Sequence, residues 1–463
     1  MLLGFLHGKK LPMVGSFFLL FSVVPLFVFP ATGLSEHDAQ RICQWALFVV
    51  AGFHSFKLRY AVSWRWMVVV AAMLGFGLAS GRWALIESVH LILLLALFSV
   101  WTTSLRERPE SALPQVYAGV AVCYLVLMLP RWAAVIVEGL PFHPQEFYFG
   151  FSNQRFFGHW VTLSLPMVVL ARDRLAALTR SPWVLDVAMG AWVSFALASG
   201  TRGTWIALAL AIAVVAVCGK GGRAFSLRLI RCIAIGSVAY TAMFVLLPWM
   251  TGSIQTALPG VGRALEGAHS SGRGTLWLFA LDGIEARPWL GNGPMSYAIT
   301  DDTYARHPHN LLLQIAYEWG IPLACAIAAL IARMLLLQIR RAISQDGRDP
   351  LHLALLAVIV GGLAQAQVDG ILIMPFSQVC FVLVCAMLCS LQLEQKLPAG
   401  NGLPGSHFYL SVGILSLAAA QLFLMWPELS RFLEWEAESL AATGVPMYQP
   451  RFWLQGVIFP GWD

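Results

Sequence analysis

Thirteen long apolar runs restrict what this chain can fold into. Each is close to the roughly 20 consecutive apolar residues that cross a bilayer as an α-helix. Only 12% of the residues are charged, about half of the ~25% typical of soluble domains. We therefore expect an all-α, polytopic transmembrane helical bundle of about 12–14 spans, with 13 favoured. The runs are residues 11–29, 41–56, 64–80, 84–103, 113–130, 157–171, 183–199, 204–218, 229–248, 311–338, 351–367, 371–391 and 407–425.

The distribution of cationic residues predicts the orientation of the bundle. Lys and Arg collect in cytoplasmic loops, and an N-terminus on the inner side, at Lys9 and Lys10, places every lysine of the chain inside. The cationic residues that remain outside are all arginines, the side chain suited to bidentate binding of phosphate or carboxylate. We expect a multi-pass membrane protein whose site faces the outer side of the membrane.

The same pattern divides the chain into four parts. Residues 1–248 are predicted N-terminal transmembrane helices, 249–308 a large periplasmic loop with short helices, and 309–425 C-terminal transmembrane helices. Residues 426–463 are a predicted periplasmic amphipathic tail, because glutamates alternate with Phe, Leu and Trp there. An outer loop this long is commonly functional.

Polar residues that stand out against the apolar background are the candidates for function. His54, Glu87 and His90 lie within early runs, where we interpret them as interhelical hydrogen-bond partners. The aromatics of 142–160 suit an interfacial belt, but the polar cluster among them, Asn153, Arg155 and His159, is not explained by that role. The remaining candidates are Arg202 in the tight turn 199–204, Arg273 and Tyr304 in the outer loop, and His307, His309 and Asn310 at the head of the run 311–338.

Motifs of other catalytic and binding classes are missing from the sequence. There is no Walker loop, no GxGxxG fingerprint and no GxSxG elbow, which argues against a nucleotide-driven enzyme. The eight cysteines show neither a disulfide framework nor zinc spacing. His307 and His309 with Asp301 and Asp302 are possible zinc ligands, but HExxH is absent. We expect no metal, no cofactor and no nucleic-acid partner.

Four segments together resemble a known superfamily. They are the turn Ser199–Trp205 (SG-x-RG-x-W), Arg273–Trp277 (R-x2-LW), Pro288–Pro294 (P-x-LGNGP) and His309–Gly320 (HN-x2-L-x4-E-x-G). This chain resembles the bacterial O-antigen ligase, O-antigen polymerase and protein O-oligosaccharyltransferase superfamily over roughly residues 150–390.

The resemblance implies a glycosyltransferase of the C type that needs neither nucleotide nor metal. It would take a glycan from undecaprenyl pyrophosphate at the periplasmic face, with inversion. By the same analogy His309 is the catalytic base, and Arg202, Arg273 and Arg155 hold the pyrophosphate. Histidine suits a base near neutral pH, and arginine keeps its charge beside a departing pyrophosphate.

Within the superfamily the acceptor is the open question. Asn153–Phe157 and Arg451–Gly456 look most like the pilin-glycosylating O-oligosaccharyltransferases, which favours a pilin or other exported protein. Transfer to lipid A core, as by an O-antigen ligase, is the first alternative, and O-antigen polymerisation and transport of the lipid-linked glycan follow. Asn153, His159, His307, Asn310 and Tyr304 are predicted contacts of the glycan or acceptor, although the resemblance leads us to expect glutamine where this chain has His159.

Overall fold

Helices make up all the regular structure of the residues described by this computed structural model, which contain no strand. The structure describes residues 13–28, 35–58, 64–107, 112–140, 142–143, 147–176, 181–252, 272–300, 303, 305–393, 406–431 and 452. The predicted all-α class is therefore confirmed for these residues.

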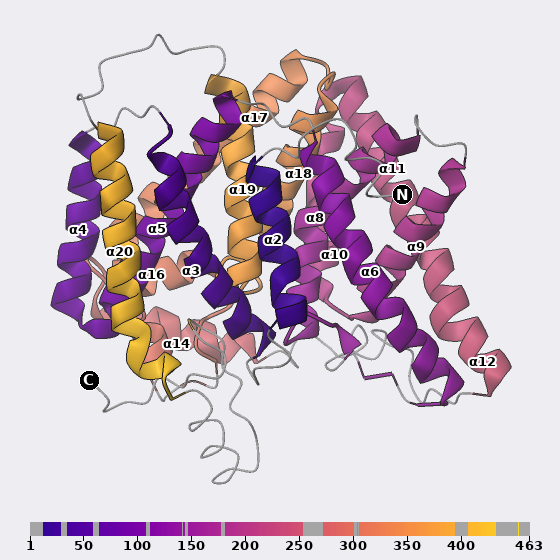
Figure 1. Ribbon diagram of the computed structural model, residues 1–463, viewed down its shortest axis with the longest axis horizontal. Helices are drawn as coiled ribbons and strands as arrows, with labels where there is room; N and C mark the ends of the chain where they lie inside the picture. Colours follow the sequence, from indigo (N-terminus) through magenta and orange to yellow (C-terminus); the bar gives the residue numbers. More distant parts are fainter. Residues whose placement is uncertain are drawn as a thin grey trace. The chain divides into compact units, whose positions relative to one another are not determined.

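The helices follow the apolar runs closely along the chain (Figure 1). In order they are α2 (Met13–Val28), α3 (Glu36–Ser55), α4 (Trp64–Ser80), α5 (Arg82–Glu107), α6 (Leu113–Val137), α8 (Gln154–Ala176), α9 (Pro182–Ala198), α10 (Arg202–Ala216), α11 (Gly219–Thr241), the π-helical turn η2 (Ala242–Leu246), α12 (Leu247–Thr251), α14 (Arg273–Ala286), α15 (Ser296–Ile299), α16 (Leu311–Trp319), α17 (Ile321–Ser344), α18 (Pro350–Gln365), α19 (Pro375–Leu393) and α20 (Ser406–Leu429).

Six of the described helical segments are long and apolar enough to cross a membrane by themselves. They are Arg82–Arg106, Leu113–Val137, Gly219–Thr251, Ile321–Ser344, Pro375–Gln392 and Phe408–Leu429. Five further apolar helices are shorter, between 10 and 17 residues. The thirteen spans thus stay a prediction, while the multi-pass character rests on the six.

The run 311–338, predicted as one span, is two helices separated at Gly320. Gly320 has φ 87°, a conformation that side chains disfavour. A Cβ atom there would lie 2.2 Å from the carbonyl oxygen of Trp289. The amide of Ile321 donates to the carbonyl of Pro288 at 2.8 Å. The turn 288–294 therefore presses on the backbone at this point and ends α16 before α17 begins.

The chain forms two compact units, each assembled from separate stretches of sequence. Unit 1 contains Met1–Leu26, Glu110–Ser271 and Ala332–Ile371. Unit 2 contains Phe27–Pro109, Gly272–Ile331 and Leu372–Asp463. The part of the predicted outer loop from Gly272 onward thus packs within unit 2.

Helices α8 and α18 form the interior of unit 1. Residues 157–171 of α8 and 352–362 of α18 are buried without interruption, as expected of a helix that is apolar all round. Gly361 lets the two approach, because a Cβ there would lie 3.1 Å from Thr162 Cγ2. Helix α8 also packs on α6 and α9, and α18 on α10.

The aromatic segment before α8 belongs to this core rather than to an interfacial belt. Phe142, Phe147 and Tyr148 are buried. The Tyr148 ring stacks on Phe157 at 4.5 Å, and its hydroxyl donates to the carbonyl of Phe195 at 2.7 Å. Burial raises the pKa of the Tyr148 phenol well above its ordinary value, so it stays a neutral donor. The belt interpretation overlooked that these rings have aromatic partners on α8 and α9.

Unit 2 is organised around a buried arginine on α3. The Arg41 side chain is 3% exposed and donates to Gln378 Oε1 of α19 at 2.8 Å and to the carbonyl of Phe452 at 3.1 Å. Its Nη1 also lies 3.0 Å from Nε2 of His90 on α5. Each contact lies in a different part of the chain, so the guanidinium joins α3, α5, α19 and the segment at Phe452. The predicted hydrogen-bonded role of His90 is confirmed here, and His54 has a similar partner in Ser104 at 3.0 Å.

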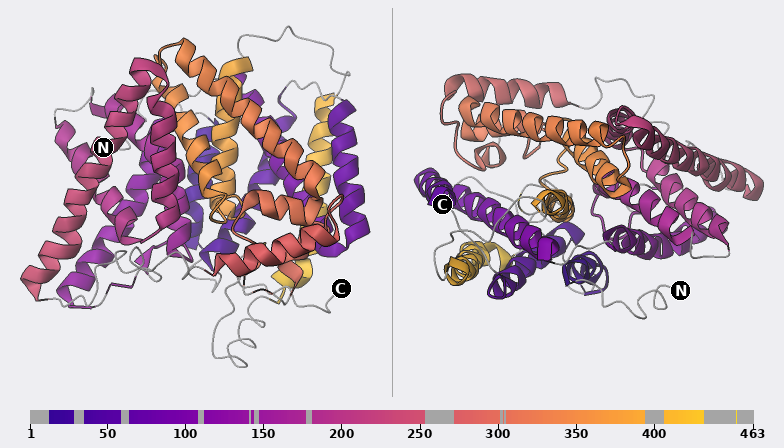
Figure 2. Two further views of the ribbon diagram at one scale, coloured as in Figure 1. Left: turned by 180° about the vertical axis from the view of Figure 1, so that it is seen from behind. Right: turned by 90° about the horizontal axis from the view of Figure 1, so that it is seen from above.

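An apolar cluster beside Arg41 includes part of the outer loop. Trp83 and Ile86 of α5 pack with Met295 and Ala298 around α15 and with Met425 of α20 and Phe452. Figure 2 shows α14 and α16 running steeply across the direction of α4 and α20. Within unit 2 the short helices of the predicted outer loop therefore lie against longer helices from the N-terminal and C-terminal parts of the chain.

Helices α14 and α16 are held together at a glycine. A Cβ atom on Gly283 would lie 2.1 Å from Cε2 of Tyr317. Asn292 donates from Nδ2 to the carbonyls of Gly283 and Tyr317, both at 3.1 Å. The glycine thus provides the space in which the Tyr317 ring sits.

Substituting Gly283 tests this packing. Gly283→Ala is expected to destabilise the protein by about 1–3 kcal/mol, because a methyl group forced into a filled site displaces the Tyr317 ring. Gly274→Ala on the same helix is the matched control, since no atom lies within 4 Å of its Cβ position; it should be neutral or stabilising by up to ~1 kcal/mol. Thermal unfolding in detergent measures both, and equal midpoints for the two variants would contradict the packing described.

Candidate functional site

The head of α16 is built so that a histidine occupies a backbone corner. Asn310 is the N-cap of α16, and its side chain accepts from the amide of Leu313 at 2.9 Å. The residue before it, His309, has φ 53°, in the left-handed region that few side chains adopt. His309 is half-buried. The cap begins the helix, and the corner projects the His309 side chain away from it.

His307 supports this corner. It is 2% exposed, and the two imidazole rings lie 4.0 Å apart at an angle of 61°. The backbone amide of His309 donates to Nδ1 of His307 at 3.3 Å. Since that nitrogen accepts, the proton of a neutral His307 ring is on Nε2. His307 thus fixes the backbone on which His309 stands.

Helix α14 holds the histidine segment from one side. Trp277 donates from Nε1 to the carbonyl of Pro308 at 2.9 Å. Arg273, half-buried, is in the first turn of α14, four residues before Trp277 and hence on the same face of that helix. Unit 2 therefore places one of the predicted pyrophosphate ligands on the helix face that supports the predicted base.

In unit 1, the start of α8 carries two more of the predicted residues. Asn153 precedes the helix, and its Oδ1 accepts from the amide of Arg155 at 2.9 Å. Arg155 is half-buried, and His159 follows it one turn later on the same face. The cap explains the position of Asn153, and the helical spacing aligns the arginine with the histidine.

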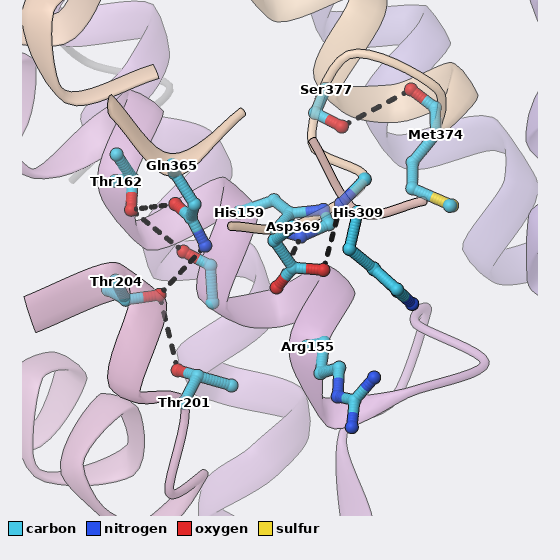
Figure 3. A network of polar contacts seen from close by, with 12 residues as sticks. Arg155, His159, Thr162, Thr201, Thr204, His309, Gln365, Asp369, Met374 and Ser377 are labelled. Atoms are coloured by element: carbon cyan, nitrogen blue, oxygen red, sulfur yellow. Dashed lines mark hydrogen bonds and ion pairs between the residues drawn. The ribbon is translucent and has the colours of Figure 1, made fainter. Parts of the chain in front are cut away.

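A chain of hydroxyl groups fixes the turn that carries Arg202. Thr201 donates to Thr204 at 3.2 Å, and Gln365 of α18 donates to Thr204 at 3.3 Å (Figure 3). Thr162 of α8 donates to Gln365 at 2.5 Å. The turn also packs on α8, because a Cβ on Gly158 would lie 2.6 Å from Thr201 Oγ1. Arg202 is thus held beside the helix turn that carries Arg155 and His159.

His159 has a carboxylate partner that lies far from it in the sequence. Nε2 of His159 is 3.2 Å from Oδ2 of Asp369, which follows α18 (Figure 3). Both are buried, at 1% and 8% exposure. Oδ1 of Asp369 accepts from the amide of Gly370 at 2.9 Å. An imidazole and a carboxylate therefore meet in the interior of unit 1.

The predicted site residues thus form two groups. Unit 2 carries His309, His307, Asn310 and Arg273, and unit 1 carries Asn153, Arg155, His159 and Arg202. Tyr304 and the aspartates Asp301 and Asp302 lie outside the described residues, as does most of the tail 426–463. Among the described residues, no three His, Cys, Asp or Glu side chains are grouped as a metal site would require.

Sequence reasoning missed Asp369 and Gln365. Both follow from the general rule that an ionisable or amide side chain within or between apolar runs is a functional candidate. Asp369 stands between the runs 351–367 and 371–391. Its contact with His159 was not predictable, because the sequence does not reveal that α8 and α18 are neighbours.

A comparison of the sequence with protein families finds a match over part of the chain. Residues 187–328 match the family model described as O-antigen ligase. No curated protein and no solved structure matches the chain.

The matched range extends from α9 into α17. It contains Arg202, Arg273 and His309, while Arg155, His159 and Asp369 lie outside it. The six long apolar helices indicate a multi-pass membrane protein, and over the matched range the chain is similar to the O-antigen ligase family.

Two substitutions of Asn310 test whether its side chain caps α16. Asn310→Asp keeps the accepting oxygen, so α16 should be as stable as in the wild type, whereas Asn310→Ala should cost about 1 kcal/mol. Hydrogen exchange of the amides of 311–314 measures the difference. A loss of protection in the Asp variant equal to that in the Ala variant would contradict the cap assignment.

Proposed function

We propose that this protein transfers an oligosaccharide, such as an O-antigen unit, from undecaprenyl pyrophosphate to a hydroxyl group of an exported protein such as pilin. The reaction takes place at the periplasmic face of the bacterial inner membrane. The observation that carries the proposal is His309, a half-buried imidazole held on a left-handed corner by His307 and by the capped start of α16.

The reaction needs a base, and His309 is the base in this proposal. The acceptor hydroxyl oxygen attacks the anomeric carbon of the glycan while the bond from that carbon to the pyrophosphate oxygen breaks. The hydroxyl proton passes to the imidazole, and undecaprenyl pyrophosphate leaves with the electron pair of the broken bond. Direct displacement inverts the configuration of the anomeric carbon. A rigid corner suits a base, since its nitrogen must stand within hydrogen-bond reach of the hydroxyl.

The arginines stabilise the leaving group. In this proposal Arg155, Arg202 and Arg273 supply fixed positive charge to the pyrophosphate. Each is half-buried and stands in the first turn of its helix, where backbone amides without helical partners also attract anions. Charge that is in place before the reaction lowers the barrier more than charge that must reorganise. Neither a metal ion nor a nucleotide is part of the proposal.

The remaining predicted residues are assigned to the glycan or acceptor. Asn153 and Asn310 each use a side-chain oxygen as a helix cap, and the NH2 groups of the same side chains are the proposed donors to the glycan or acceptor. His307 acts through His309. Tyr304 and His159 complete the proposed set.

Lipid A core is the second candidate acceptor. The description of the matched family, O-antigen ligase, favours it, whereas the sequence segments 153–157 and 451–456 favour a protein acceptor. Both candidates use the same base and leaving group.

Replacing His309 by asparagine tests the base. Asparagine tolerates the left-handed backbone, so the corner should persist while the imidazole is lost. We expect transfer to fall by at least about 100-fold, within the usual contribution of a general base. Transfer of glycan from purified lipid-linked donor to acceptor is measured in proteoliposomes.

His143→Asn is the control for this substitution. His143 is an exposed histidine of unit 1 outside the proposed site, so transfer should be unchanged. Both variants should insert into membranes at the level of the wild type. Transfer by His309→Asn within a few-fold of the wild type would exclude His309 as the base.

The acceptor is identified in cells with and without the protein. We expect the mass of pilin to increase by that of the glycan, on a Ser or Thr, only when the protein is present, and the lipopolysaccharide pattern on gels to be the same in both. Mass spectrometry of purified pilin and gel analysis measure this. Unmodified pilin together with a loss of O-antigen from lipopolysaccharide would assign the protein as a ligase to lipid A core.

A further inference from the structure

The pair Asp369 and His159 is the strongest polar feature of unit 1 that the proposed reaction does not use as a pair. Asp369 lies just beyond the C-terminal end of α18, whose interior residues are buried on all sides. A carboxylate in such surroundings is costly unless it is paired. The His159 ring forms an ion pair with it, with Nε2 at 3.2 Å from Oδ2.

The ring of His159 leaves one nitrogen for a ligand. Phe156 packs against it, with the ring centroids 5.9 Å apart. Neither ring nitrogen has a hydrogen bond of good geometry among the described residues, although the side chain is 1% exposed. Nε2 still has an ion-pair contact with Asp369 at 3.2 Å, whereas Nδ1 has no ion-pair contact there. An unpaired buried polar atom costs roughly 1–3 kcal/mol. If the pair served only to hold α8 against the segment after α18, this cost would have no compensating gain. A ligand that accepts from Nδ1 would provide that gain.

The surroundings of His159 select an anionic ligand. Arg155 stands one turn earlier on the same face of α8. The turn bearing Arg202 contacts α8 at Gly158, the residue next to His159. Two cations on this side of the helix attract a doubly phosphorylated group, and a hydrogen bond from His159 to that group needs a proton on Nδ1. That proton is then a charge-assisted donor.

Resting on the function proposed above, we infer that His159, positioned by Asp369, donates from Nδ1 to the pyrophosphate of the lipid-linked donor, between Arg155 and Arg202. His159 then contacts the pyrophosphate of the substrate instead of the glycan or acceptor to which it is assigned above, and Asp369 is a positioning residue that acts through the ring. Binding of the leaving group at these unit 1 residues does not require the proposed base on α16.

Binding of undecaprenyl pyrophosphate without a glycan tests this inference. The full-length protein is placed in nanodiscs, and the Kd is measured by quenching of tryptophan fluorescence. His159→Gln should weaken binding about tenfold or more, because a hydrogen bond to a charged group is lost. Asp369→Asn should weaken it by about three- to tenfold. Undecaprenyl monophosphate is the second probe, and its binding should depend less on His159.

The double variant separates positioning from general structural support. If Asp369 acts through His159, Asp369→Asn should add less than about twofold in the His159→Gln background, whereas independent effects multiply. His352→Gln is the matched control, a buried histidine at the other end of α18 that contacts Gln338 at 2.9 Å; it should leave the Kd unchanged. Thermal unfolding shows which variants are folded. Should His159→Gln not fold, Asp369→Glu, which restores the carboxylate, should recover most of the binding lost in Asp369→Asn.

The outcomes distinguish this inference from the proposed function. Two results would overturn the inference, even if His309→Asn abolishes transfer. One is a folded His159→Gln variant that binds undecaprenyl pyrophosphate within twofold of the wild type. The other is a double variant in which the effects of His159→Gln and Asp369→Asn on the Kd multiply. His159-dependent binding in a protein that transfers no glycan to any acceptor would support the inference and refute the function.

Discussion

A guanidinium group among apolar helices must find its acceptors inside the protein, and Arg41 does so by joining distant parts of unit 2. Its donors reach α5, α19 and the segment at Phe452, and the Phe452 ring lies under the charge at 4.8 Å. Leaving such a group unpaired costs several kcal/mol. The cluster of Trp83, Met295 and Phe452 beside it supports the outer loop, so the position of the histidine segment depends on this buried charge.

Most of the residues that make the candidate site recognisable have a local structural reason as well. Asn153 and Asn310 begin helices, and Gly320 and the turn 288–294 end one. The side chains proposed to act in the reaction, such as Arg155, stand directly beside these caps and turns. Rigid helix ends are the natural supports for such groups, since a cap fixes the backbone within one residue of the side chain that reacts.

The apolar runs made the helices predictable, since a span long enough for a bilayer leaves few alternatives. The division at Gly320 was not predictable, because it depends on the backbone of a turn some thirty residues earlier in the chain. Local patterns identified His309, Arg202 and Arg273 as candidates, whereas Asp369 was missed because its significance lies in its proximity to His159. Contacts between residues far apart in the chain produce no periodic pattern in the sequence.

The interleaving of the two units has a consequence for biosynthesis. Unit 2 takes its segments from residues 27–109, 272–331 and 372–463, and the cluster under the outer loop combines Trp83 with Met425. When the ribosome has made the histidine segment, the helices that complete its support have not yet emerged. The early helices must therefore stay in the membrane for a time without the final partners of some of their buried polar groups. The loop reaches its final packing only after α20 has been inserted.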